Sequence, residues 1–259
     1  AQIIAVANQK GGVGKTTTAV NLSALLGAMG QRVLMIDLDP QGNTTSGLGM
    51  EVDDKSIYEV IMGRMKLTDV MEETEFKNLS IAGSDVRLAN AELELVEVEK
   101  REYRLKTAVQ SVQQDFDFIF IDCPPSLGLL TINALGAADS VLIPIQCEYY
   151  ALEGVASLMN TISRVKKTIN PHLEIEGVLL TMLDGRTNLG LQVVDEVKKH
   201  FKKQVYATVI PRSVRLGEAP SHGEPIHVYD KRSAGCVAYV NLAKEVLKRN
   251  NIKVKEFKL

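Results

Sequence analysis

Apolar runs of strand length alternate with longer segments of helical pattern along this sequence. Because these runs are nearly continuous, they are typical of strands covered on both faces, as in a parallel sheet. The expected strands are IIAVAN (3–8), RVLMIDLD (32–39), LSIAGS (79–84), DFIFIDCP (117–124), SVLIPIQ (140–146), IEGVLLTM (175–182) and QVYATVIP (204–211). The expected helices span residues 15–29, 86–98, 101–114, 149–168, 188–203 and 233–249. This alternation predicts an α/β fold, with a doubly wound, mostly parallel sheet and helices on both faces.

The chain shows no clear boundary between domains. It has no linker rich in Pro, Gly or Ser, and its 259 residues suffice to bury a substantial core. We expect a single domain over residues 1–259, with the irregular, acid-rich stretch 43–78 as an insertion after the second strand. No apolar run reaches the ~18 residues of a membrane-spanning helix, and the N-terminus does not resemble a signal peptide. Three widely spaced cysteines favour a reducing cytoplasm over a disulfide framework or a zinc site.

Charge is distributed unevenly along the chain. Residues 1–180 hold 15 Lys and Arg against 24 Asp and Glu, a net charge of −9. Residues 181–259 hold 15 against 8, a net charge of +7. A basic C-terminal third is typical of a surface that binds phosphate-rich DNA or an anionic membrane, although a solvated helical surface has the same composition.

A glycine-rich loop, NQKGGVGKTTTAV (8–20), joins the first expected strand to the first expected helix. Its glycines allow a tight turn whose N–H groups point at phosphate oxygens, and the helix adds the positive end of its dipole. Lys15 is placed to reach the β- and γ-phosphates, the Thr16 hydroxyl to hold Mg²⁺, and Thr17 to bond the α-phosphate. The residues expected to bind ATP or ADP here are Gly11, Gly12, Val13, Gly14, Lys15, Thr16 and Thr17.

Aspartates follow two of the expected strands. Asp37 and Asp39 end one strand on a common face, and Asp122 ends another. Asp37 and Asp122 are candidate Mg²⁺ ligands, with Asp37 acting through water, and Asp39 is the candidate for orienting the attacking water. Helix N-capping is the alternative role for any one of these aspartates. The turn from Pro124 to Gly128 then has the composition of a switch loop that responds to the γ-phosphate.

The glycine-rich loop departs from the usual G-x-x-x-x-G-K-[ST] pattern, because Gln9 replaces its first glycine and Lys10 precedes Gly11. Together, the segments KGGVGKTT, DLDPQGNTTSGLG, IDCPPSLGLLTINAL, PIQCEYYALEG, TMLDGRTNLG and IPRSVRLGEAPSHG resemble the ParA/Soj family of chromosome and plasmid partition ATPases, its chromosomal Soj-like branch in particular. The resemblance runs from Ile3 to about Leu247. It implies a deviant Walker-A loop and a homodimer that sandwiches two ATP molecules, in which Lys10 reaches the partner's phosphates. It thus adds Lys10 to Lys15 and Asp39 as catalytic candidates.

The same resemblance implies further partners. ATP-bound dimers of the family bind double-stranded DNA without sequence preference, and the matching positions here are Arg186 and Arg215, both in the basic third. Pro211 and Arg212 match a segment that lies by the adenine in relatives. The family partner is a ParB/Spo0J protein at centromere-like sites, which stimulates slow hydrolysis and so resets the cycle. We therefore expect a cytoplasmic, nucleoid-associated protein without stable membrane association.

Three other classes of protein are alternatives. A MinD-like membrane ATPase ends in a basic amphipathic helix, but the apolar residues of the tail NNIKVKEFKL fall at mixed spacings. A redox ATPase needs cysteines in a cluster-binding context, which Cys123 and Cys147 lack. A metabolic P-loop enzyme needs a dedicated substrate pocket, for which the sequence shows no candidate.

Overall fold

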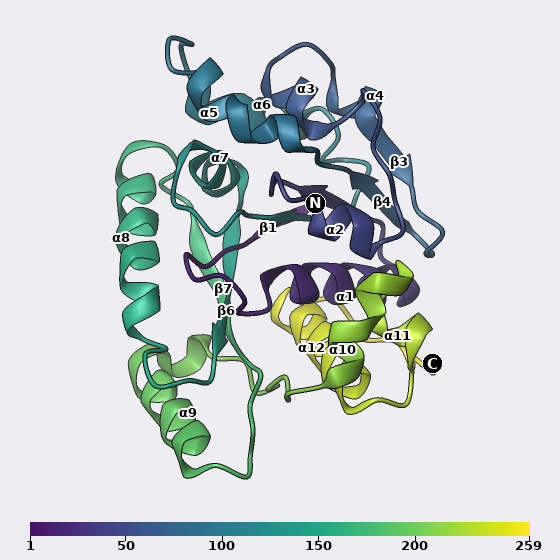
Figure 1. Ribbon diagram of the computed structural model, residues 1–259, viewed down its shortest axis with the longest axis vertical. Coiled ribbons are helices and arrows are strands. Elements are labelled where there is room, and N and C mark those ends of the chain that lie inside the picture. The colour runs from purple at the N-terminus through teal and green to yellow at the C-terminus, as the bar shows by residue number, and fades with distance from the viewer.

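A seven-stranded sheet forms the centre of the computed structural model, which describes residues 1–259 (Figure 1). Its strand order is β3-β4-β2-β5-β1-β6-β7, and every neighbouring pair is parallel except β3 with β4. The strands are β1 (Gln2–Val6), β2 (Val33–Asp37), β3 (Met71–Glu73), β4 (Leu79–Ala82), β5 (Phe118–Asp122), β6 (Ser140–Gln146) and β7 (Glu174–Thr181). The predicted doubly wound, mostly parallel sheet is therefore confirmed.

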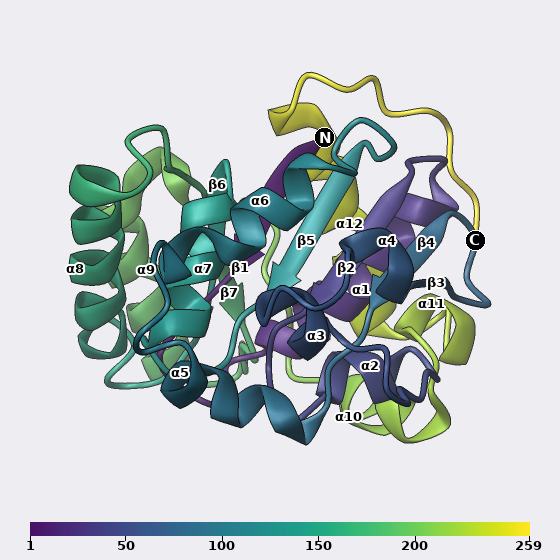
Figure 2. The same cartoon turned by 90° about the horizontal axis from the view of Figure 1, so that it is seen from above.

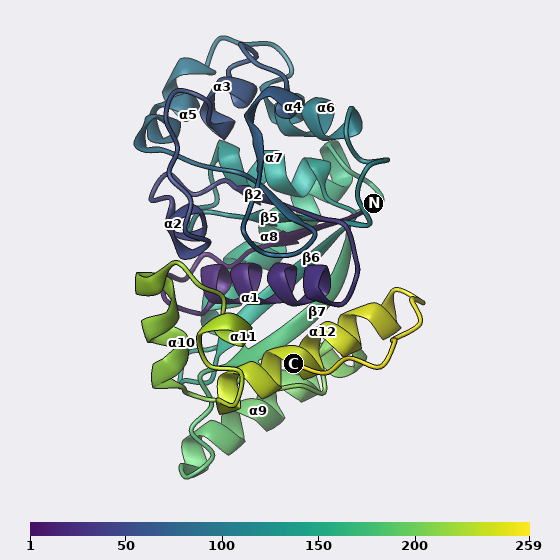
Figure 3. The same ribbon diagram turned by 90° about the vertical axis from the view of Figure 1, so that its right-hand side faces the viewer.

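Helices cover both faces of this sheet, and Figure 3 shows α1 and α12 below it with α7 above. The helices are α1 (Lys15–Ala28), α2 (Asn43–Gly47), α3 (Ile57–Ile61), α4 (Leu67–Val70), α5 (Ala91–Glu94), α6 (Arg104–Gln110), α7 (Leu129–Ala137), α8 (Glu153–Thr168), α9 (Asn188–Phe201), α10 (Val214–Glu218), α11 (Ile226–Tyr229) and α12 (Ala234–Arg249). None of them has the length and apolar character needed to cross a membrane. Because all layers share one sheet, we propose that residues 1–259 form one domain.

Side-chain alternation along the strands builds two separate cores. In β1, Ile3 and Ala5 join the core under α7 and α8, whereas Ile4 and Val6 join the core under α1 and α12. Successive side chains of a strand point to opposite faces, so a strand buried on both faces has to be apolar throughout. This is why the strand runs are continuous in the sequence.

The expected last strand, residues 204–211, is wrong. This segment runs beside β7 but makes only isolated bridges, from Val205 and from Pro211. Between them, the backbone N–H groups of Ala207 and Thr208 donate to the carboxylate of Glu245 on α12, at 2.7 and 3.0 Å. These two donors are therefore diverted from the sheet, and the segment bulges away from β7.

Several expected helices differ from those observed. Residues 86–98 form a 3₁₀ turn at Val86–Asn90 followed by the one-turn α5, so the expected long helix is wrong. Residues 101–114 are helical only to Gln110. Helices α7, α10 and α11 lie outside the ranges in which the sequence predicts helices. The irregular stretch 43–78 folds into α2, α3, α4 and the antiparallel edge strand β3.

The C-terminal tail after α12 is extended rather than helical, and Figure 2 shows it running along the outer edge of the molecule to the C-terminus. Its apolar side chains, Ile252, Val254 and Phe257, are partly buried against the core under α1 and α12. The lysines between them, Lys253 and Lys255, are exposed. The mixed spacing of the tail is thus that of an extended segment that packs Ile252, Val254 and Phe257 on its own chain and leaves Leu259 exposed.

Candidate functional site

The carboxyl ends of β1, β2 and β5 meet at one edge of the sheet. Asp37 and Asp122 are register partners on the adjacent parallel strands β2 and β5. Strand β1 leads into the glycine-rich loop, which then enters α1 at Lys15. Because parallel strands end together, residues that lie far apart in the sequence gather at this edge, as expected for a ligand site in a doubly wound sheet.

The glycine-rich loop presents free hydrogen-bond donors. None of the backbone N–H groups from Gly11 to Thr17 donates to an acceptor within the protein. Gly12 and Gly14 have φ values of +72° and +89°, which residues with a Cβ rarely adopt. Clustered N–H groups without partners at the start of a helix form an anion cradle. The loop therefore fits a phosphate chain.

Lys15 is buried, with 8% of its surface exposed, and its Nζ donates to the backbone oxygen of Lys10 at 2.8 Å. Burial lowers the pKa of Lys15, while the charge of Asp122 opposes that shift. The loop is also anchored to β7, because the Thr181 hydroxyl donates to the Val13 oxygen at 2.8 Å. Val13 therefore fixes the loop through its backbone, and its side chain is buried away from the surface.

Two adjoining cavities run along the loop. The first, about 340 Å³, is lined by the glycines together with Lys15, Thr16, Thr17, Asp39, Gln41, Asn43, Pro125 and Met182. The second, about 190 Å³, is lined by Thr181, Ile210, Pro211, Arg212, Ser213, Leu216, Gly217 and Tyr239. Both include Gly14, Thr17 and Met182, so they form one groove. The polar first part fits phosphates and the more apolar second part fits a base, next to Pro211 and Arg212.

Asp122 lies behind the loop and is completely buried. One carboxylate oxygen, Oδ2, accepts from the Thr16 hydroxyl at 2.9 Å and from the Thr44 hydroxyl at 2.6 Å. The other, Oδ1, is buried without a partner. Burial, followed by the nearby charge of Asp37, raises the pKa of Asp122 to about 7. An unpartnered buried carboxylate oxygen next to a threonine hydroxyl suits a cation or a cation-bound water.

Asp37 and Asp39 occupy different positions. Asp37 is fully buried, and its oxygens accept from Thr45 and from the Asp39 N–H. Burial raises the pKa of Asp37 to about 6. Asp39 lines the phosphate cavity, which Asp37 does not. The structure thus brings Asp39 to the cavity and keeps Asp37 one layer behind it.

These residues fit a nucleotide with Mg²⁺. No three His, Cys, Asp or Glu side chains gather into a self-contained metal site. Mg²⁺ characteristically takes few protein ligands and completes its shell with water and substrate phosphates. The Thr16 hydroxyl and the free oxygen of Asp122 are the groups that would hold it, with Asp37 behind them.

Lys10 does not line the phosphate cavity, although Gly11 beside it does. Its ammonium group is paired with the carboxylate of Glu148, just after β6, and both side chains are about one-third exposed (38% and 35%). Its aliphatic stem lies near Gly154 at the start of α8. The structure therefore separates the two lysines of the loop, one directed into the nucleotide groove and one directed along the surface.

The arginines expected to bind DNA are exposed but paired. Arg186 makes two 2.9 Å bonds to Asp184, which lowers the pKa of that carboxyl to about 2. Arg215 is paired with Glu218 at 3.1 Å and with Asp230 at 3.3 Å. By contrast, Lys198, Lys199, Lys202 and Lys203, on α9 and just after it, are exposed and have no ion-pair partner.

Sequence reasoning missed several residues of the groove. Met182 lines both cavities with a φ of +54°, a strained value for a side chain of this kind. Thr44 shares the Asp122 oxygen, and Tyr239 bonds the Thr18 hydroxyl from α12 at 2.9 Å. No local pattern marks these residues, because they reach the site only through tertiary packing.

Comparison with known proteins agrees with this geometry. Residues 1–175 match a family model described as an AAA domain. The sporulation initiation inhibitor protein Soj of Bacillus subtilis is 59% identical over 247 residues, which are 95% of this chain and 98% of that protein. The chromosome partitioning protein ParA of Myxococcus xanthus is 51% identical over 254 residues, 97% of this chain and 90% of that protein.

A similar solved structure is cobyrinic acid a,c-diamide synthase of Mycobacterium smegmatis with bound ADP and magnesium. It superposes with a TM-score of 0.85 at 38% identity, covering 96% of this chain and 95% of that one. The predicted fold, the ATPase class and the cofactor class, an adenine nucleotide with Mg²⁺, are thereby confirmed. With more than half of its residues identical to those of Soj, and about half identical to those of the ParA of Myxococcus xanthus, the chain belongs to the ParA/Soj family of chromosome-partitioning ATPases.

Proposed function

We propose that this ATPase partitions DNA by a nucleotide-gated dimer, in which ATP binding joins two subunits and hydrolysis separates them. The observation that carries the proposal is the position of Lys10, whose ammonium group lies outside the phosphate cavity of its own chain. A lysine directed along the surface beside a phosphate cradle is suited to the nucleotide of a second subunit. Dimerisation then depends on ATP, because the added negative charge favours the joined state.

Within one subunit, different residues of the groove bind the nucleotide and promote its hydrolysis. The N–H groups of the loop hold the phosphate chain, Lys15 neutralises it, and Pro211 and Arg212 border the base. Bound Mg²⁺ supplies charge neutralisation at the β- and γ-phosphates. Asp122 and Asp37 keep Thr16 and the strand ends in place around it. Asp39, at the cavity wall, orients the attacking water.

The catalytic set lacks a cation beyond the two lysines at the phosphates. Phosphoryl transfer develops charge that a further donor has to stabilise, so slow turnover is expected from the chain alone. We propose that a ParB-like partner completes the site and thereby times the release of the dimer. Hydrolysis in this scheme is a timer that returns the protein to the monomer.

DNA is the proposed surface on which the dimer acts. The relatives are named for chromosome partitioning, and the basic C-terminal third carries exposed Arg186 and Arg215. Contacts of arginine to phosphate are blind to sequence and sensitive to salt. Nucleoid association follows from this proposal. A membrane-bound role is disfavoured, because Ile252, Val254 and Phe257 of the tail pack on the chain itself and leave Leu259 as its only exposed apolar residue.

The decisive experiment compares Lys10→Ala with Asp39→Ala by light scattering and by co-sedimentation with DNA or with anionic liposomes, each with Mg-ATP, Mg-ADP and no nucleotide. Lys10→Ala should still bind ATP but stay monomeric and off DNA, since only the trans contact is lost. Asp39→Ala, the matched variant at the same edge, should dimerise, stay on DNA and hydrolyse poorly. A Lys10→Ala protein that dimerises normally with ATP would refute the trans role, and binding to anionic liposomes instead of DNA would favour the membrane alternative.

A further inference from the structure

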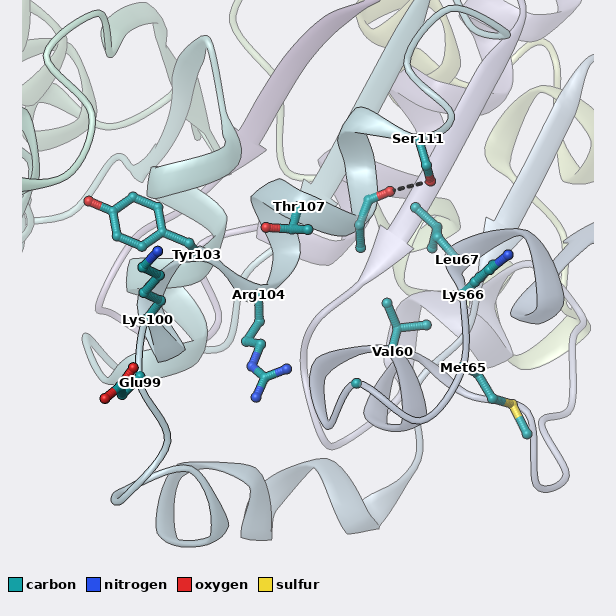
Figure 4. A pocket seen from close by; sticks show the side chains of 12 residues that line it. Val60, Met65, Lys66, Leu67, Glu99, Lys100, Tyr103, Arg104, Thr107 and Ser111 are labelled. Carbon is teal, nitrogen blue, oxygen red and sulfur yellow. Dashed lines mark hydrogen bonds between the residues drawn. The ribbon is translucent and has the colours of Figure 1, made fainter.

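A separate cavity, of about 570 Å³, lies away from the nucleotide groove. It is on the face of the sheet opposite to α1, between the helices of the insertion and α6. It shares no residue with the nucleotide groove. Its apolar wall is made by Val60, Met65, Leu67 and Ala108. Figure 4 shows Arg104 pointing from α6 into the space between this wall and the segment that carries Lys100. A volume of this size holds a small-molecule ligand.

The charges around this cavity are unbalanced. Lys66, Lys100 and Arg104 line it, against the single carboxylate of Glu99. None of the three cations has an ion-pair partner within the chain. Most other arginines of the chain are held by carboxylates, as Arg87 is by Asp85 and Glu59. The cavity therefore concentrates positive charge that the protein itself leaves unmatched.

Arg104 is the sharpest case. It is half-buried, its guanidinium donates no hydrogen bond within the protein, and its Nε is shielded from solvent without a partner. A buried donor without an acceptor is destabilising, and more so when the group is charged. The Nε and one Nη of a guanidinium form the fork that binds carboxylate or phosphate through two parallel bonds. The Nε of Arg104 is thus placed to donate to an oxyanion.

The loop around Gly63, opposite α6, leaves space for this guanidinium. Gly63 has a φ of +75°, and a Cβ at this position would lie 2.7 Å from Arg104 Nη1. Any side chain at position 63 would therefore displace the guanidinium. Nearby hydroxyls complete the polar rim: Thr107 is exposed, and the Ser111 hydroxyl already donates to the Ala108 oxygen at 2.7 Å (Figure 4).

We propose that this cavity binds a small organic anion, with a phosphate or carboxylate group on the fork of Arg104, a second negative charge towards Lys100, and an apolar body against Val60, Met65 and Leu67. The shared chemistry is that of an oxyanion on an apolar body. The site stands apart from the partition cycle, because it uses none of the residues of the nucleotide groove. It makes the insertion a ligand-binding element of this chain.

The test is NMR titration of the full chain in metal-free buffer with saturating ADP, which keeps the nucleotide groove occupied. Pyrophosphate, citrate and the apolar sulfonate 8-anilinonaphthalene-1-sulfonate are the three probes. The backbone amides of Gly63 and Thr107 and the side-chain Nε–H of Arg104 should shift together and saturate. Pyrophosphate and citrate separate phosphate from carboxylate recognition, and the sulfonate reports the apolar wall.

Arg104→Gln should weaken binding at least about ten-fold, because a charge-assisted pair is lost, and Lys100→Asn should weaken it by about three-fold. Asn is chosen at position 100 because the backbone there has a φ of +54°. The matched control, Lys106→Gln, removes a positive charge from α6 outside the cavity and should change affinity less than about two-fold. If Arg104→Gln does not fold, the Lys100→Asn and Lys106→Gln pair decides. Equal affinities in that pair, or no saturable shift at Arg104 with any probe, would overturn the proposal.

Discussion

The nucleotide edge and the basic C-terminal third are both charged, but the charges are buried at the nucleotide edge and exposed in the basic third. At the nucleotide edge, Lys15, Asp37 and Asp122 are buried and bonded within the chain before any ligand binds. In the basic third, Arg186 and Arg215 are exposed and neutralised by neighbouring carboxylates. A buried charge depends strongly on its partner, because removing the partner leaves the charge uncompensated. The attraction within an exposed ion pair is weakened by salt and water, so such a pair contributes little to stability.

The comparison also shows why the net charge of the basic third overstates the number of cations that are free to bind DNA. The basic third has a net charge of +7, yet the two arginines that the family resemblance selects are tied to acids. The four lysines of the α9 segment, Lys198, Lys199, Lys202 and Lys203, are exposed and have no ion-pair partner. Arginines that must first leave a carboxylate bind phosphate with less net gain than free lysines do. Effects at this surface should therefore be small and dependent on salt.

The largest effect is expected for Lys15→Ala. Removal of a buried cation from the phosphate cavity should abolish measurable ATP binding, because a charge-assisted contact to two phosphates is lost. The measurement is fluorescence titration with a labelled ATP, and the matched control is Lys198→Ala, an exposed lysine on α9. Retained nucleotide affinity in Lys15→Ala would contradict the assignment of the phosphate loop.

An intermediate effect is expected for the buried carboxylates as the pH changes. The pKa of Asp122 is raised from its ordinary value to about 7, so the folded protein holds that proton more tightly than the unfolded chain does. Its contribution to stability is complete below the unfolded pKa of about 3.9 and is lost as the pH rises through about 7. In the absence of nucleotide and metal, the wild-type chain should lose roughly 2 to 3 kcal/mol more than Asp122→Asn between pH 5 and pH 8.

Urea unfolding in EDTA at several pH values measures this difference. Asp139→Asn is the control, because Asp139 also accepts a backbone N–H, from Ile3 at 2.8 Å, but lies away from the strand ends of the site. Parallel pH profiles for the wild type and Asp122→Asn would show that this carboxylate is already ionised in the free protein.

The smallest effect is expected at the paired arginines. Asp184→Asn releases Arg186 and should strengthen DNA binding of the ATP-bound form by a few-fold at low salt. Arg186→Gln removes one phosphate contact, so the slope of the logarithm of the DNA affinity against the logarithm of the salt concentration should become shallower by about one. Glu256→Gln, which makes the same change of charge at another exposed pair in the tail, is the control. Filter binding between about 50 and 200 mM salt measures both quantities. If Asp184→Asn and Glu256→Gln behave alike, the gain reflects overall charge and not the release of Arg186.

Local sequence patterns identified the phosphate loop, the aspartates at the strand ends and most of the sheet. They could do so because a parallel strand buried on both faces and a loop that binds phosphate both require particular residues at particular positions. The same reasoning failed for residues 204–211, which are as apolar as a strand. Within this segment the N–H groups of Ala207 and Thr208 are taken by Glu245, a residue from a helix that follows much later in the chain.

The sequence by itself determined six of the seven expected strands and the residue types of the loop from Lys10 to Thr17, because both patterns lie within short runs of consecutive residues. Only the tertiary structure decided which charges are free. It paired Lys10 with Glu148 and Arg186 with Asp184, it buried Asp37 behind Asp39, and it left Arg104 without a partner in a cavity of its own. The pairing of a charge depends on what packs beside it in space, and that information is spread over the whole fold.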